Sequence, residues 1–220
     1  MKAFLRNNGL SLTLLALFAV SLVGQALTGW RAHAEELRIH NLPEIGLSAY
    51  LASGHFISAV FENWESEFLQ MGAYVVLTVF LVQKGSSESK KPDEDNPEDE
   101  PPHVRRGDPD APWPVHRGGL VLKLYSHSLS IALFGLFAVS FWLHLAGSTR
   151  RMNEEAARHG QPLATMAETL GDPEFWYESF QNWQSEFLSI AVLILLGIVL
   201  RERGSPESKP VAAPHAMTGH

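Results

Sequence analysis

The stretch SLTLLALFAVS at residues 11–21 decides the fold, because it returns as SIALFGLFAVS at residues 130–140 with seven of eleven positions identical. Two more stretches return at the same offset of 119. FENWESEFL at 61–69 becomes FQNWQSEFL at 180–188, and GSSESK at 85–90 becomes GSPESK at 204–209. The two copies therefore align without a gap, and each carries two long apolar stretches. Duplicated apolar helices are typical of membrane proteins.

Of four apolar stretches, the first and third are long enough to be membrane helices by themselves. The second and fourth are long enough if the preceding NWESE and NWQSE segments lie at the interface in the same helix. Residues 9–27, 68–83, 126–149 and 187–200 contain no Asp, Glu, Lys or Arg. A bilayer core requires roughly 20 helical residues, and only helices or closed barrels satisfy their backbone hydrogen bonds in lipid. These continuous apolar runs lack the alternation of a membrane barrel. We predict an all-α membrane protein with four transmembrane helices, arranged as two parallel helical hairpins, at residues 8–29, 57–83, 121–148 and 176–201.

The chain between the hairpins has a different composition. Residues 92–102 read PDEDNPEDEPP, which is acidic, rich in proline and free of large apolar side chains. Such a segment cannot bury enough surface to fold, and we expect a solvated tether. The predicted domains are a first two-helix membrane repeat, a disordered linker, a second two-helix repeat and a disordered tail, at residues 1–84, 85–118, 119–203 and 204–220.

The distribution of Lys and Arg predicts the orientation. Twelve of them lie at the termini and in the linker, and five lie in the two other loops. The positive-inside rule therefore places both termini and the linker in the cytoplasm, so both hairpins run in the same direction. The N-terminus resembles a signal peptide, but its repeat lies in the middle of the chain. We expect the first segment to remain as a transmembrane helix.

Two glutamates are the most prominent polar side chains near the predicted spans. Glu67 and Glu186 each follow a tryptophan by three residues and precede an apolar run. Asn63 and Asn182 lie one helical turn before them. If the tryptophans mark the membrane interface, the carboxylates lie at the rim of the hydrocarbon core.

The preceding helices carry polar partners at a similar depth. Because consecutive helices run antiparallel, Gln25 can meet Glu67, and His144 can meet Glu186. Polar groups at this level face other helices. Two interpretations remain open: hydrogen bonds that lock the helices together, or a pocket that binds a proton, an ion or a small ligand.

A second duplicated pattern lies in the loops opposite the linker. Glu36 and His40 match Glu155 and His159 at the offset of 119. Each pair is one helical turn apart, and carboxylate with imidazole at this spacing can hold a divalent metal. Two such pairs brought together would supply four ligands. The alternative is a solvated helical extension with local ion pairs.

Several classes of function are disfavoured by the sequence. The chain has no cysteine, which excludes disulfides and thiolate sites, and its net charge of −7 does not suggest nucleic-acid binding. It lacks a glycine-rich phosphate loop, a GxSxG elbow and an HExxH motif. We expect no cofactor and no catalytic residues. The expected partners are the lipid bilayer and either another membrane protein or a second copy of the chain.

The sequence also resembles a known family. The segments FLRNNGLSLTLLALFAVSLVGQALTGW, SGHFISAVFENWESEFLQMGAYVVLTVFL and QKGSSESKKP are similar to those of a bacterial family of uncharacterised membrane proteins, catalogued as a domain of unknown function. The NWESEFLQ block is the most specific part. The resemblance implies a bacterial inner-membrane protein with four spans, and it implies no activity.

Three hypotheses for function follow. The first is a non-enzymatic structural or accessory membrane protein. The second is a small transporter or channel-like protein that uses Glu67, Glu186 and His144. The third is a membrane enzyme with a metal held in the loops, and it has the least support.

Overall fold

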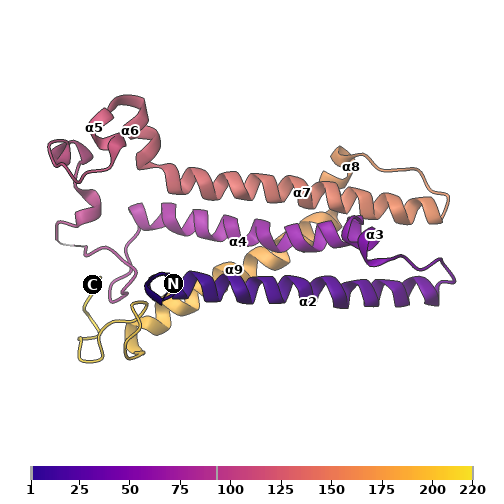
Figure 1. Ribbon diagram of the computed structural model, residues 1–220, viewed down its shortest axis with the longest axis horizontal. Helices are drawn as coiled ribbons and strands as arrows, with labels where there is room; N and C mark the ends of the chain where they lie inside the picture. The colour runs from indigo at the N-terminus through magenta and orange to yellow at the C-terminus, as the bar shows by residue number, and fades with distance from the viewer. Residues whose placement is uncertain (1, 93, 220) are drawn as a thin grey trace. The chain divides into compact units, whose positions relative to one another are not determined.

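The computed structural model describes residues 2–92 and 94–219, and in this part of the chain every regular element is a helix. Figure 1 traces them along the chain. The long helices are α2 (Gly9–Ile39), α4 (Gly54–Phe80), α7 (Ser128–Arg158) and α9 (Pro173–Val199). The short ones are α1 (Lys2–Asn7), α3 (Leu47–Leu51), η1 (Pro97–Asp99), η2 (Pro102–Arg105), α5 (Trp113–Arg117), α6 (Gly119–Ser126) and α8 (Met166–Leu170). The prediction of an all-α protein is confirmed.

The helices of the two halves have matching bounds. Adding 119 to the first and last residues of α2, α3 and α4 gives those of α7, α8 and α9. The match continues into the GSxESK segments, where Gly85 and Gly204 both have φ of +88°. In each segment a serine hydroxyl accepts a hydrogen bond of 2.9 Å from a backbone N–H six residues earlier, Ser89 from Gln83 and Ser208 from Glu202. The two halves therefore share their local structure, and the arrangement as two parallel hairpins stays a prediction.

The helices differ from their predicted limits mainly at one end. α2 and α7 each continue ten residues beyond the predicted ends at 29 and 148. The added segments are charged, but they are rich in Ala, Glu, Leu and Arg, which favour helix. The third predicted helix is interrupted at His127, where α6 ends before α7 begins.

Three long helices, α2, α7 and α9, are long and apolar enough to cross a membrane. Their apolar side chains are largely exposed, for example Leu10, Val20 and Leu195. A continuous exposed apolar surface of this kind is suited to lipid. α4 is not among these three helices. The fourth span therefore stays a prediction.

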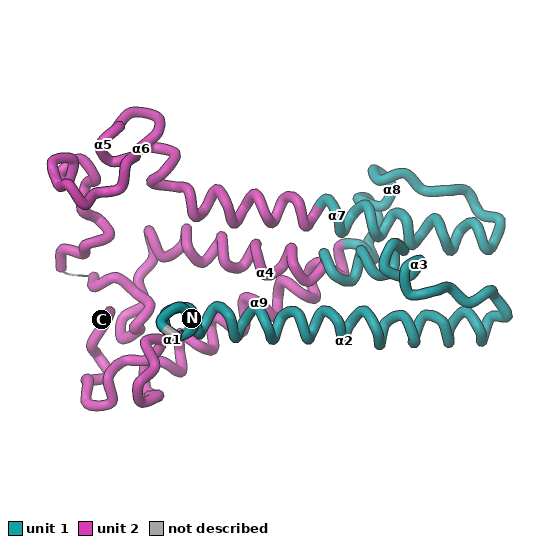
Figure 2. Tube along the Cα trace, in the orientation of Figure 1, with its two compact units in different colours: residues 1–61, 142–175 teal, residues 62–141, 176–220 magenta. Residues whose placement is uncertain are grey.

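The chain divides into two compact units, coloured separately in Figure 2. Unit 1 comprises residues 1–61 and 142–175, and unit 2 comprises residues 62–141 and 176–220. The division falls within α4, α7 and α9. It does not follow the predicted domain limits, which remain untested. Each unit is described separately below.

Unit 1 contains a very close contact between α4 and α7. A Cβ atom added to Gly54 would lie 2.3 Å from the backbone nitrogen of Arg151, and one added to Gly147 would lie 2.5 Å from the backbone nitrogen of Ser58. The hydroxyls of Ser58 and Ser148 form a buried hydrogen bond of 2.8 Å across the same contact. Small residues therefore allow the two backbones to meet, as is common between membrane helices.

Unit 2 is packed mainly through aromatic rings. The ring of Trp183 lies edge-on to Phe180 at 5.3 Å and to Trp176 at 6.3 Å between centroids. Phe137 of α7 also contacts Trp183, at 6.4 Å. On α4, Gly72 leaves room for Phe134, whose ring would lie 3.2 Å from an added Cβ. Edge-to-face arrangements of this kind are favourable for aromatic pairs.

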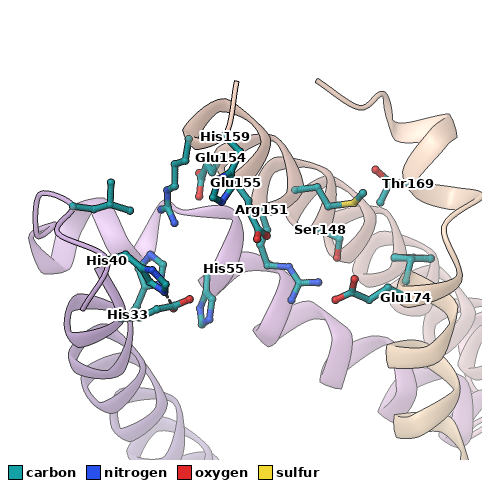
Figure 3. Close-up of a pocket in the computed structure, with 15 residues that line it drawn as sticks. His33, His40, His55, Ser148, Arg151, Glu154, Glu155, His159, Thr169 and Glu174 are labelled. Carbon is teal, nitrogen blue, oxygen red and sulfur yellow. Dashed lines mark hydrogen bonds and ion pairs between the residues drawn. The ribbon is translucent and has the colours of Figure 1, made fainter. Parts of the chain in front are cut away.

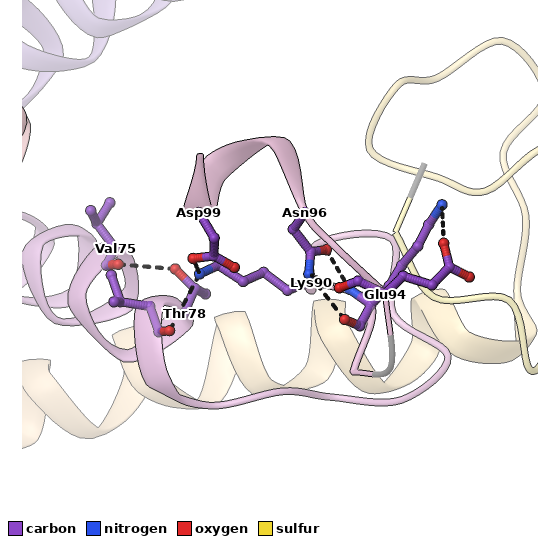
Figure 4. Close-up of polar contacts among 8 residues, drawn as sticks. Val75, Thr78, Lys90, Glu94, Asn96 and Asp99 are labelled. Atoms are coloured by element: carbon purple, nitrogen blue, oxygen red, sulfur yellow. Dashed lines mark hydrogen bonds and ion pairs between the residues drawn. The ribbon is translucent and has the colours of Figure 1, made fainter. Parts of the chain in front are cut away.

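The linker and the tail contain short turns held by polar contacts. In the linker, Lys90 pairs with Asp99, and Asn96 bonds the backbone of Lys91 and Glu94, as Figure 4 shows. In the tail, buried Lys209 donates to the carbonyl oxygens of Gly85, His215 and Met217 at 2.6, 2.8 and 3.2 Å. The linker contacts join residues close in sequence, whereas Lys209 also ties the tail to Gly85 at the predicted start of the linker. The predicted disorder of both segments stays a prediction.

We predict that Gly147→Ala destabilises the protein by about 1–3 kcal/mol, because the added methyl group would force α4 and α7 apart. Thermal unfolding of the purified protein in detergent would measure the effect. Gly24→Ala is the matched control, since no atom lies within 4 Å of a Cβ added there. Equal midpoints for the two variants would contradict the tight contact.

Candidate functional site

Unit 1 encloses a polar cavity of about 580 Å³, which we call the histidine chamber. It is formed by the end of α2, the start of α4, the end of α7, α8 and the start of α9. Its charged and titratable lining consists of four histidines, four glutamates and two arginines: His33, His40, His55, His159, Glu36, Glu154, Glu155, Glu174, Arg151 and Arg158. Figure 3 shows His33, His40 and His55 grouped at one side of it.

Two histidines from different helices stack in this group. The rings of His33 on α2 and His55 on α4 lie 4.9 Å apart with an interplanar angle of 29°. His33 is only 7% exposed. Its Nδ1 atom lies 3.3 Å from a carboxylate oxygen of Glu36, one turn further along α2. The three side chains therefore form a connected polar cluster.

A buried tyrosine supports this cluster. The hydroxyl of Tyr50, on α3, forms a hydrogen bond of 3.4 Å with Nδ1 of His55. Tyr50 fits against α2 because Gly29 has no side chain: a Cβ there would lie 2.2 Å from the tyrosine hydroxyl. The indole N–H of Trp30 donates a bond of 2.8 Å to the carbonyl of Ile45, which ties the loop before α3 to α2. The contacts of Tyr50 and Trp30 thus hold α3 and the loop before it against α2, next to the cluster.

The charges around His55 affect its protonation. Burial is the largest influence and lowers the pKa of His55, and the nearby His33 and Arg151 lower it further. Glu36 and Glu154 act in the opposite direction but do not reverse the shift. His55 is therefore mainly neutral at pH 7. A neutral imidazole can accept a proton or bind a metal.

Glu154 has a structural role at the chamber wall. Its carboxylate accepts a bond of 2.9 Å from Arg150 and one of 3.4 Å from the backbone N–H of Gly54. That N–H belongs to the first turn of α4, where backbone donors lack partners within the helix. Glu154 thereby caps α4 from α7 and helps to position His55.

The four predicted metal candidates all line the histidine chamber. Glu36 and His40 reach it from α2, and Glu155 and His159 reach it from α7. The duplicated pattern therefore converges on one cavity, as metal binding would require. Among these side chains, no three ligand atoms lie within 4.8 Å of one another in the described structure. All four could bind one ion only after side-chain rotation.

The predicted glutamates at the membrane rim both lie in unit 2. Glu67 is exposed on α4, and Glu186 is half-buried on α9. They are close enough to interact electrostatically. Asn63 is exposed, whereas Asn182 donates a side-chain hydrogen bond to Glu62. The structure thus brings the two glutamates near each other.

The partners predicted for these glutamates lie in unit 1. Gln25 is half-buried on α2. His144 is fully buried on α7, with its ring 4.7 Å from that of Phe175. Because each predicted pair has one member in each unit, the pairs Gln25–Glu67 and His144–Glu186 stay predictions.

Sequence reasoning missed two glutamates that link α4 to α9. Glu65 is fully buried and accepts a bond of 2.9 Å from the hydroxyl of Ser179, and Glu62 accepts one from Asn182. A signal was present, since these are the two positions at which FENWESEFL differs from FQNWQSEFL. The two differences between otherwise identical motifs are thus the two acidic side chains bonded to α9.

We predict that Glu65→Ala destabilises the protein by about 1–3 kcal/mol, because the buried hydroxyl of Ser179 loses this acceptor. Glu65→Gln retains an acceptor oxygen and should cost much less. Gln184→Ala, at the equivalent exposed position of α9, is the control and should leave the unfolding midpoint in detergent unchanged. A loss as large for Glu65→Gln as for Glu65→Ala would show that the negative charge is needed instead.

Comparison with known proteins gives no activity. No curated protein and no solved structure matches the chain. One family model matches residues 1–220, which is the entire sequence. The chain therefore belongs to the family described as domain of unknown function (DUF6766).

Proposed function

We propose that this protein is a non-enzymatic accessory protein of a bacterial inner membrane, which holds a small-ligand chamber outside the lipid. In this proposal it crosses the membrane four times as two like-oriented hairpins, with both termini in the cytoplasm. The observation that carries the proposal lies within α2 and α7. Each helix has an exposed apolar part that ends in a charged helical extension lining the histidine chamber.

The distribution of charge along these helices supports a chamber outside the bilayer. α2 has no charged residue from Gly9 to Trp30 and then carries Arg31, Glu35 and Glu36 within its next two turns. α7 changes in the same way at Arg150. Charged side chains are costly in hydrocarbon and stable in water or among headgroups. The chamber therefore belongs beyond the membrane end of each helix.

The hydroxyl groups of the chamber support binding over catalysis. Ser148 is bonded to Ser58 across the contact of α4 and α7. Thr169 of α8 accepts a bond of 2.9 Å from Thr149 of α7. A serine or threonine nucleophile needs a base that takes its proton. These hydroxyls are instead used in helix packing, while imidazoles and carboxylates face the cavity.

Cysteine labelling would test the predicted four-span topology. The sequence has no native cysteine, so only the introduced cysteines would react. Single cysteines at the exposed positions Ser48 and Gln161 should react with a membrane-impermeant maleimide in intact spheroplasts. Cysteines at Asp110 and Ala212 should react only after lysis. If α4 did not cross, the cysteine at Asp110 would react in intact spheroplasts together with that at Ser48. That result would contradict the four-span arrangement.

A second candidate function, a small transporter or channel-like protein, is favoured by the interaction of Glu67 with Glu186. Two carboxylates that interact across helices can share a proton or attract a cation, and they titrate as a pair. In this proposal the two carboxylates form a site for a proton or a cation at the rim of the membrane core. His144 would be the further proton carrier.

If the protein is a transporter or channel, Glu67→Gln and Glu186→Gln should each abolish proton movement into liposomes that contain the protein and a pH-sensitive dye. Removal of one carboxylate breaks the pair, so either variant should be enough. Gln184→Ala is the control. An unchanged flux in the double variant, or no flux with the unmodified protein, would exclude this function and leave the accessory role.

A further inference from the structure

We propose that the histidine chamber binds a divalent transition-metal ion of the zinc class through His33, Glu36, His40 and His55. The proposal deepens the proposed function, because it names the ligand of the chamber. It does not depend on how many times the chain crosses the membrane. The four side chains line one cavity, although they are separated by up to 22 positions in the sequence.

Three of these side chains lie on one face of α2. His33, Glu36 and His40 are spaced i, i+3 and i+7, and residues at this spacing are neighbours on a helix surface. α2 remains helical through Ile39, and His40 forms its C-cap. The spacing therefore presents two imidazoles and one carboxylate to the same side of the helix.

The first pair is already placed as two ligands of one ion would be. Nδ1 of His33 and a carboxylate oxygen of Glu36 lie 3.3 Å apart. Two donor atoms bound to a tetrahedral zinc ion at about 2.0 Å lie about 3.3 Å from each other. In the described structure no nitrogen of His40 or His55 lies within 4.8 Å of both atoms, so binding of one ion by the set requires side-chain rotation. The metal would replace the proton that His33 and Glu36 otherwise share.

The third ligand is His55 of α4, whose ring is oriented by a hydrogen bond to Tyr50. His55 stacks against His33, and its Nδ1 bonds the buried hydroxyl of Tyr50. Metal-binding histidines usually use one ring nitrogen for the ion and the other for a hydrogen bond that fixes the ring. Nε2 of His55 is thus the nitrogen assigned to the metal. Tyr50 acts as a positioning residue.

The composition of the set selects the metal. Three imidazoles and one carboxylate suit zinc and similar ions, whereas calcium and magnesium prefer sites made of oxygen atoms. We therefore expect binding of Zn²⁺ and no comparable binding of Ca²⁺ or Mg²⁺.

The second repeat provides a natural comparison within the same cavity. The positions equivalent to the four ligands are Met152, Glu155, His159 and Glu174, and all four line the chamber. This set has one imidazole in place of three. It is poorer in zinc ligands, although it shares the backbone positions of the first. We therefore assign the ion to the first set alone.

The test is Zn²⁺ titration of the full-length protein in detergent, carrying an affinity tag without histidine and treated first with a chelator. We expect one high-affinity Zn²⁺ per chain. The double variant His33→Gln, His55→Gln should weaken this binding by about 100-fold or more, and Tyr50→Phe by about 10–100-fold. The matched double variant Met152→Gln, Glu174→Gln should bind like the unmodified protein.

Three results of the Zn²⁺ titration would overturn the proposal. They are the absence of Zn²⁺ binding to the unmodified protein, unchanged binding in the His33→Gln, His55→Gln variant, and an equal loss in His159→Gln, which would place the ligands in both repeats. Co²⁺ binding to the unmodified protein gives a readout that requires no variant. Intense visible bands of a four-coordinate ion are expected, and the weak bands of a six-coordinate ion would contradict the site. The cysteine labelling reports topology separately, so failure of one test leaves the other interpretable.

Discussion

The close contact between α4 and α7 in unit 1 is the constraint on which the chamber depends. Gly54 and Gly147 bring the two backbones within a distance that a methyl group would prevent. The same contact places the N–H of Gly54 next to Glu154, so the start of α4 is capped by α7. His55 is the next residue after Gly54, so the same contact fixes its backbone near α7. A wider separation would remove the cap and move His55 away from the chamber wall.

The two halves of the sequence show how helices with matching bounds can carry different side chains at equivalent positions. α3 packs on α2 through Tyr50 and Gly29, and the equivalent positions in the second repeat are Thr169 and Ser148. The first pair supports a histidine, since the tyrosine hydroxyl reaches His55. In the second pair each hydroxyl bonds a residue of a neighbouring helix, Thr149 or Ser58. Matching helix bounds therefore coexist with different chemistry, because side chains at a few contacts have changed.

Much of the fold could be predicted from the sequence, because long apolar runs have few alternatives to helix. The predicted ends at residues 29 and 148 lie ten residues before the ends of α2 and α7, because the helices continue past the end of the apolar runs into charged sequence. The equal offset singled out Glu36, His40, Glu155 and His159, which all line one cavity, and their binding of a metal stays a prediction. His33 and His55 were missed because the second repeat has Met152 and Glu174 there, and a search for identical pairs passes over such positions. Glu62 and Glu65 were missed for the same reason.

The charged end of α2 is held more firmly than a solvated extension would be. Trp30 ties it to the loop before α3, Tyr50 packs against Gly29, and His33 stacks on His55. These contacts come from three residues of α2, at positions 29, 30 and 33, and the candidate ligands lie among or just beyond them. Because these contacts hold the end of α2 in the folded state, its backbone loses less conformational entropy when a ligand arrives. An ion that joined α2 to α4 would in turn stabilise the folded state, because it would bind that state in preference to the unfolded chain. Binding and stability of unit 1 would then be linked through the same few side chains.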